Sequence, residues 1–104
     1  MVVGAIGVAK ENGVLWLGTQ SSQTSLAPEI VVANQVYHWE VVIREIMDLI
    51  AGGTLGGKSF VISLADGGEV MEYNPAFDLP ADVKALADQT VQGIIEETIT
   101  ITLP

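Results

Sequence analysis

The fold is decided by residues 14–51, VLWLGTQSSQTSLAPEIVVANQVYHWEVVIREIMDLIA. The apolar run at 14–18 ends in glycine, which is typical of a strand covered on both faces. Polar residues fill 19–25, so we expect a loop outside the core there. Strand character returns at 30–36, and apolar residues then recur every three or four positions over 37–51. That spacing predicts an amphipathic helix with one buried face, and the order of elements indicates an α/β fold.

The flanking segments continue this alternation. Residues 1–12 predict a short or partial helix that stops at Gly13, and the glycine pair at 52–53 ends the central helix. Further elements are expected in the rest of the chain: a covered strand at 60–64, a turn at 66–68, a strand at 70–73, a helix at about 80–96 that Asp78 could cap and that buries Val83, Leu86, Val91, Ile94 and Ile95, and a half-exposed strand at 98–103. We therefore expect residues 1–104 to form a single α/β unit, an open and mostly parallel sheet flanked by helices.

Composition narrows the classes of function. The chain has 13 acidic and 4 basic residues and a net charge of −9, so it offers little with which to neutralise phosphates, and we expect no nucleic-acid binding. Hydrophobic residues make up 49% and charged residues 16%, which favours a packed interior over disorder. There is no cysteine, which excludes disulfides and thiolate metal sites. No apolar run reaches the roughly 20 residues that a membrane helix needs, and residue 1 is not followed by a secretion signal.

The polar loop after the first strand is one candidate site. Ligands of open α/β sheets bind beyond the carboxyl ends of the strands. There, Gln20, Ser21 and Gln23 carry amides and a hydroxyl that both donate and accept hydrogen bonds, which suits a neutral polar ligand such as a sugar or a nucleoside. A solvated loop is the simpler explanation of the pattern when it is taken alone.

Asp66, Gly67 and Gly68 are the second candidate. A carboxylate can accept two hydrogen bonds from neighbouring hydroxyls, and glycines let the backbone approach a ligand closely. The alternative is an ordinary Asp-Gly turn. A phosphate cradle is disfavoured because the companion motifs of a phosphate-binding loop are missing from the sequence.

The cluster Tyr37, His38 and Trp39 could stack on a ring-containing ligand, but we favour packing in the core or at its boundary, at the start of a helix. His38 is the only histidine and has no cysteine or second imidazole with which to hold a metal. We find no nucleophile with a base and no acid–base pair, so we expect a non-enzymatic chain that needs no cofactor and no metal.

Three segments taken in order carry a family resemblance: GVLWLGTQSSQTSLAPEIVVANQVYHWEVVIREIMDLIAGG, FVISLADGGEVMEY and PADVKALADQTVQGIIEE. They resemble the strand, ligand loop, Leu-Ala-Pro, strand and Trp-led helix, then the Leu-x-Asp-Gly-Gly strand and the closing helix, of the C-terminal third of the BMP family. These basic-membrane-protein or purine-nucleoside-receptor-like lipoproteins are the solute-binding proteins of ABC importers. The resemblance covers nearly the whole chain in register.

The resemblance implies a type I periplasmic-binding-protein fold, in which two α/β lobes hold a ligand in a cleft and deliver it unchanged to a permease. It also implies an extracytoplasmic parent, a periplasmic or cell-surface lipoprotein whose export signal lies upstream of this fragment. In nucleoside-binding members the loop reads Val-Asp-Ser-Asp-Gln, and its first Asp bonds the ribose. Here Thr19, Gln20, Ser21, Ser22 and Gln23 replace both carboxylates with neutral groups, and Gln20 remains the first site residue, followed by Asp66, Gly67 and Gly68.

A missing N-terminal lobe would leave apolar faces uncovered. We therefore expect the isolated chain to form a homo-oligomer that covers Val83, Leu86, Ile94 and the alternating Thr-Ile segment. Two alternatives to transport remain: a sensory or protein-interaction domain that shares the lobe fold, and an enzyme, for which no catalytic set is visible.

Overall fold

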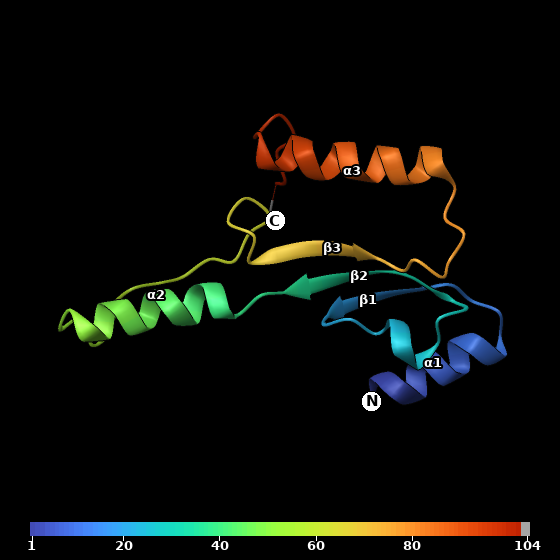
Figure 1. Ribbon diagram of the computed structural model, residues 1–104, viewed down its shortest axis with the longest axis horizontal. Helices are drawn as coiled ribbons and strands as arrows, with labels where there is room; N and C mark the ends of the chain where they lie inside the picture. Colours follow the sequence, from blue (N-terminus) through green and yellow to red (C-terminus); the bar gives the residue numbers. More distant parts are fainter. Residues whose placement is uncertain (103–104) are drawn as a thin grey trace.

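Residues 1–102 are described by a computed structural model and contain three α-helices and one three-stranded sheet (Figure 1). The chain is therefore α/β, as the sequence predicts. Its elements follow in the order α1 (Val2–Glu11), β1 (Trp16–Gln20), the short 3-10 helix η1 (Thr24–Leu26), β2 (Val31–Tyr37), α2 (Glu40–Ala51), β3 (Glu69–Tyr73) and α3 (Ala81–Ile95).

The sheet is mixed, with strand order β1-β2-β3. β1 pairs with β2 in parallel, whereas β3 pairs with β2 antiparallel, so the expected mostly parallel sheet is only half correct. The segment 60–64, predicted as a covered strand, forms no strand, and Val61 is 79% exposed. Without that segment in the sheet, the next strand after α2 is β3, which returns along β2 in the opposite direction.

The helix boundaries agree with the sequence to within a few residues. Gly13 and Gly53 have φ values of +63° and +87°, and this left-handed conformation, which glycine adopts without steric cost, follows the ends of α1 and α2. Pro80 is the N-cap residue of α3 and makes no side-chain cap, so Asp78 does not cap this helix. Residues 98–102 form no strand, which corrects that prediction for the described part; residue 103 lies outside the described residues.

The hydrophobic core is small and lies where α1 and η1 meet β2. It consists of Ile6, Ala27, Ile30 and Val31, with Ala9 and Trp16 packed against it. β1 is an edge strand, and Leu17 is 68% exposed, so the expectation of a strand covered on both faces is wrong. The outer side of β1 has no neighbouring strand within residues 1–102.

A buried asparagine ties the core end of the sheet together. Asn74, directly after β3, donates from Nδ2 to the carbonyl oxygens of Pro28 at 2.7 Å and Val31 at 2.6 Å. Its Oδ1 accepts a hydrogen bond from the Ala76 amide at 2.9 Å. One side chain thus joins the segment before β2 to the segment after β3.

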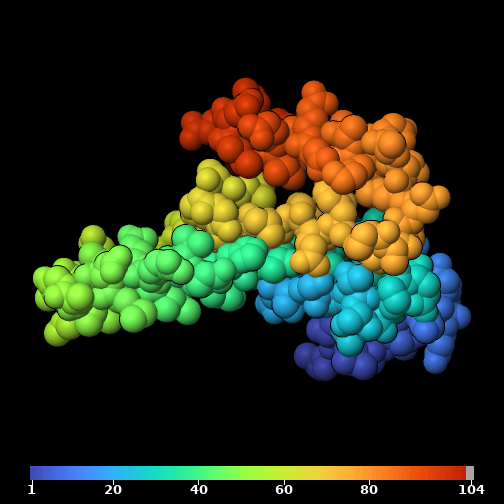
Figure 2. Space-filling view, viewed as in Figure 1, coloured from blue at the N-terminus to red at the C-terminus, as the bar shows by residue number. Residues whose placement is uncertain are grey.

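Helix α2 has no buried side chain, contrary to the buried face that its periodicity predicts. The helix projects from the sheet as an arm, seen at the left of Figures 1 and 2. An apolar stripe along it, made of Trp39, Ile43, Met47 and Ile50, is more than half exposed. The arm explains a radius of gyration of 17.1 Å, compared with roughly 13 Å for a compact domain of this length.

Helix α3 runs beside the β3 ribbon in the view of Figure 1, and like α2 it leaves residues expected in the core exposed. Val83 and Leu86, expected in the core, are exposed, and the other three predicted core positions of this helix are half-buried. The contact with the sheet includes Lys84, whose Nζ lies 4.5 Å from the centre of the Tyr73 ring and 2.5 Å from an oxygen of Asp88. Burial raises the pKa of Tyr73, and the nearby Asp88 carboxylate adds to the rise.

Candidate functional site

The two loops singled out from the sequence lie at the same end of the sheet. β1 and β2 run in parallel, so their carboxyl ends meet there (Figure 1). Because β3 runs antiparallel to β2, its first residue, Glu69, and the turn 66–68 before it also lie at this end of the sheet. The amide of His38, directly after β2, donates to the carbonyl oxygen of Gly68 at 2.8 Å. The end of β2 and the turn are therefore joined.

The strand register sets the distance between Gln20 and β3. Gln20, the last residue of β1, lies opposite Val36, which in turn lies opposite Val70 of β3. Neighbouring strands are about 4.8 Å apart, so Gln20 and β3 are separated by roughly 10 Å. A metabolite of that length could contact the polar groups on both sides of β2.

Gln20 is exposed and has an unusual backbone. Its φ of +75° is left-handed, a conformation that costs a non-glycine residue about 1 kcal/mol. The chain turns sharply out of β1 at this point. The side chains of Gln20 and its exposed neighbour Ser21 are therefore in contact with solvent and accessible to a ligand.

Gln23 has a different environment from Gln20. It is 7% exposed; its Oε1 accepts from Trp16 Nε1 at 2.8 Å and its Nε2 donates to the carbonyl oxygen of Thr19 at 2.9 Å. The expectation that 19–25 lies outside the core is wrong at this residue. With both ends of its amide in internal bonds, Gln23 braces the loop, and a ligand would have to displace one of those bonds to reach it.

A second buried amide supports the same loop. Asn34 of β2 is fully buried. Its Oδ1 accepts a hydrogen bond from the backbone amide of Gln23 at 3.0 Å, and its Nδ2 donates to Thr24 Oγ1 at 2.9 Å. Gly18 is its partner across the strand pair, and a Cβ at Gly18 would lie 2.2 Å from Asn34 Oδ1. Glycine is therefore required there for Asn34 to reach the loop. Nothing in the polar pattern of residues 19–25 points to this brace.

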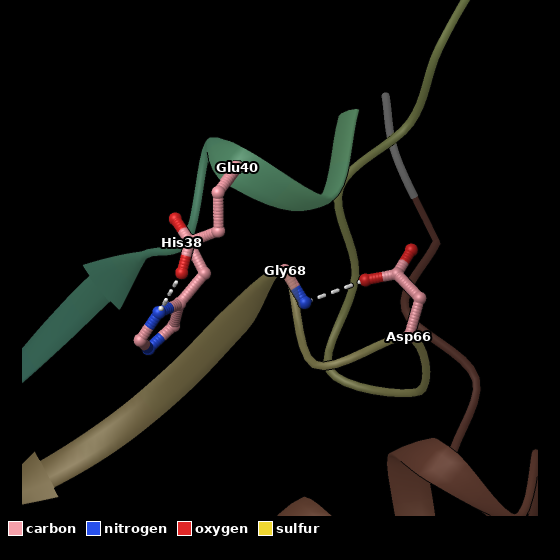
Figure 3. Close-up of polar contacts among 4 residues, drawn as sticks. All are labelled: His38, Glu40, Asp66 and Gly68. Atoms are coloured by element: carbon pink, nitrogen blue, oxygen red, sulfur yellow. Dashed lines mark hydrogen bonds and ion pairs between the residues drawn. The ribbon is translucent and has the colours of Figure 1, made fainter. Parts of the chain in front are cut away.

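The predicted turn at 66–68 is confirmed, and its aspartate holds it together (Figure 3). Asp66 Oδ1 accepts from the Gly68 amide at 2.7 Å and the Ser63 amide at 3.2 Å, and Gly67 has a φ of +72°. The bond from Gly68, and next those from Ser63, hold the pKa of Asp66 below its ordinary value. Since a carboxylate offers about four lone-pair positions, the second oxygen of Asp66 can accept hydrogen bonds from a ligand.

His38 and Glu40 stand beside the turn, as Figure 3 shows. His38 Nδ1 lies 2.9 Å from Glu40 Oε1, and the pKa of Glu40 is lowered by a backbone hydrogen bond and then by His38. Within residues 1–102, no group of three metal-binding side chains comes together.

An aromatic hollow of about 280 Å³ lies next to these polar groups and is lined by Tyr37, Trp39, Phe60, Ile62 and Glu69. Trp39 is 55% exposed, so it is not a core residue at the start of α2. The hollow adjoins the turn through Glu69, which follows Gly68 in the chain. Neither Gln20 nor Asp66 lines the hollow. This end of the sheet therefore has two neighbouring features: an exposed polar strip, made of Gln20, Ser21 and Asp66, and the aromatic hollow.

No protein-family model matches the chain, and no curated protein matches it. In the part of the chain that the structure describes, no helix is long and apolar enough to span a bilayer. The family resemblance therefore stays a proposal that depends on the residues themselves.

Proposed function

We propose that this chain binds a small polar metabolite, with a nucleoside as the first candidate, and releases it unchanged. In this proposal it is the C-terminal part of a two-lobe, BMP-like solute-binding protein that supplies an ABC importer from outside the cytoplasm. The observation that supports the proposal is the shared end of the sheet: Gln20 ends β1, the Asp66 turn precedes β3, and Gln20 lies roughly 10 Å from Val70, the β3 residue in register with it.

The polar groups at this end of the sheet suit a ligand rich in hydroxyl groups. Gln20 and Ser21 both donate and accept, Asp66 is a charged acceptor, and the exposed Gly67 lets the backbone approach a ligand closely. Hydrogen bonds to a charged acceptor are roughly twice as strong as neutral ones. We therefore assign Asp66 the largest share of the polar binding energy, with Gln20 and Ser21 fixing the orientation. Gln23 supports the loop from within.

Calorimetry with a panel of purine nucleosides, pyrimidine nucleosides and free sugars tests this assignment in the protein expressed from the whole gene. We expect saturable binding of at least one nucleoside, weakened about tenfold by Asp66→Asn because the charged acceptor is lost. Asp78→Asn is the matched control, an exposed aspartate in the loop before α3. A flat response across the panel would remove the nucleoside assignment, and equal affinities for both variants would remove Asp66 from the site.

The uncovered apolar residues support a second part of the proposal, that the 104-residue chain alone forms a homo-oligomer. Val83, Leu86 and Ile101 of the Thr-Ile segment are exposed, and a symmetric partner would cover them. Analytical ultracentrifugation should show a dimer or larger species whose population rises with protein concentration. A stable monomer across the micromolar range would contradict it.

The exposed α2 stripe also favours an alternative, a sensory or protein-interaction domain in which this arm contacts another protein. Neighbouring genes distinguish the two. Genes for a permease and an ATPase favour transport, whereas a gene for a kinase or regulator favours sensing.

A further inference from the structure

Aromatic side chains form most of the lining of the hollow. Three of the chain's six aromatic side chains, those of Tyr37, Trp39 and Phe60, line it together. The rings of Tyr37 and Trp39 have centroids 5.6 Å apart and are inclined at 75°, so two walls meet nearly at a right angle. They come from the end of β2 and the residue before α2, whereas Phe60 comes from the segment that returns toward β3.

The polar wall of the hollow is acidic. Glu69 is half-buried, and its Oε1 accepts a hydrogen bond from Gln35 Nε2, which fixes the carboxylate beside the rings. None of the five lining residues is basic. The net charge of −9 over the whole chain adds a field that attracts cations.

From these walls, the geometry points to a binding site for a small organic cation, a quaternary ammonium or methylated amine head group, in the hollow lined by Tyr37, Trp39, Phe60, Ile62 and Glu69. Ring faces attract a cation within about 6 Å of their centres, and aromatic cages recognise quaternary ammonium groups in this way. The volume of about 280 Å³ is just below the roughly 300 Å³ at which drug-sized pockets begin, which suits a head group. This inference does not depend on nucleoside binding at the neighbouring polar strip.

The test compares choline with 3,3-dimethylbutan-1-ol, which has the same shape without the charge. Two-dimensional NMR of the ¹⁵N-labelled chain resolves the indole signals of its two tryptophans, Trp16 and Trp39. We expect choline to shift the Trp39 signal saturably and the Trp16 signal little, because Trp16 packs against the core. The neutral alcohol should bind at least tenfold more weakly.

Matched variants locate the site. Glu69→Gln should weaken choline binding severalfold, whereas Glu72→Gln, an exposed carboxylate on the same strand, should leave it unchanged. Trp39→Leu should weaken it about tenfold, measured by the choline-dependent shift of a backbone amide beside the hollow. Equal binding of choline and the neutral alcohol by the unaltered chain, or a Trp39 signal that choline does not move, overturns the inference. Choline binding without any nucleoside response would leave it standing and reject the nucleoside assignment alone.

Discussion

Replacing Gly18 by alanine should lower the free energy of unfolding by about 3 kcal/mol, near the upper end for overpacking in a packed interior. The added Cβ would lie 2.2 Å from Asn34 Oδ1 and 3.2 Å from Gln23 Cδ. Asn34 cannot yield without losing its bonds to Gln23 and Thr24, so the whole loop brace is disturbed. Urea denaturation followed by circular dichroism measures the change.

Gly4→Ala is the control for this substitution. Gly4 lies inside α1, and an added Cβ there meets nothing within 4 Å. Alanine should therefore raise the free energy of unfolding by about 0.5–1 kcal/mol, the usual difference between the two residues within a helix. If Gly18→Ala unfolds at the same urea concentration as the unaltered chain, the described approach of Asn34 to Gly18 is wrong.

The substitution Asn74→Ala should cost about 2–4 kcal/mol, because each buried polar group left without a partner costs about 1–3 kcal/mol. The carbonyl oxygens of Pro28 and Val31 lose a donor, and the Ala76 amide loses its acceptor. Since small domains are stable by only about 5–15 kcal/mol, a marked fall in melting temperature follows. Thermal denaturation measures it, and hydrogen exchange at Ala76 should accelerate.

Asn12→Ala provides the comparison, because the Asn12 side chain also bonds a carbonyl oxygen, that of Val8, but in an exposed position. Its loss should change stability by less than about 0.5 kcal/mol. Similar losses in the two variants would show that the Asn74 bonds do not stabilise the connection between the start of β2 and the end of β3.

The sequence identifies the helices well because their signals are local. The three- to four-residue spacing in 37–51 and 80–96 predicts α2 and α3, and glycines at the ends of α1 and α2 mark where they stop. Periodicity reveals which face of a helix is apolar, but it does not reveal what covers that face. The buried faces expected for α2 and α3 therefore failed at Ile43, Ile50 and Leu86, which the rest of the described chain leaves exposed.

For the strands and the candidate site, too, features with a local sequence signal could be predicted, whereas features that depend on long-range contacts could not. An apolar run such as 60–64 has the composition of a strand, but a strand also needs a partner whose hydrogen bonds are free, and composition carries no information about that. The turn at Asp66 could be predicted because its signal is local, but Gln20 is the last residue of β1 rather than part of a loop after it, and Asp66 precedes β3 instead of following a strand at 60–64. The brace through Gln23, Asn34 and Gly18 could not be predicted, because it joins residues whose proximity appears only once β1 and β2 are paired.

The hydrogen bond between the His38 amide and the Gly68 carbonyl oxygen has a mechanical consequence. This bond joins the two ends of the segment that contains α2, so the chain leaves the sheet and returns to it at almost the same point, which we call the neck. A pivoting movement of the arm about this neck would leave the pairing of β2 with β3 unchanged. The walls that Trp39 and Phe60 supply lie beyond the neck, whereas Tyr37 and Glu69 belong to the sheet, so the same pivot would widen or narrow the hollow.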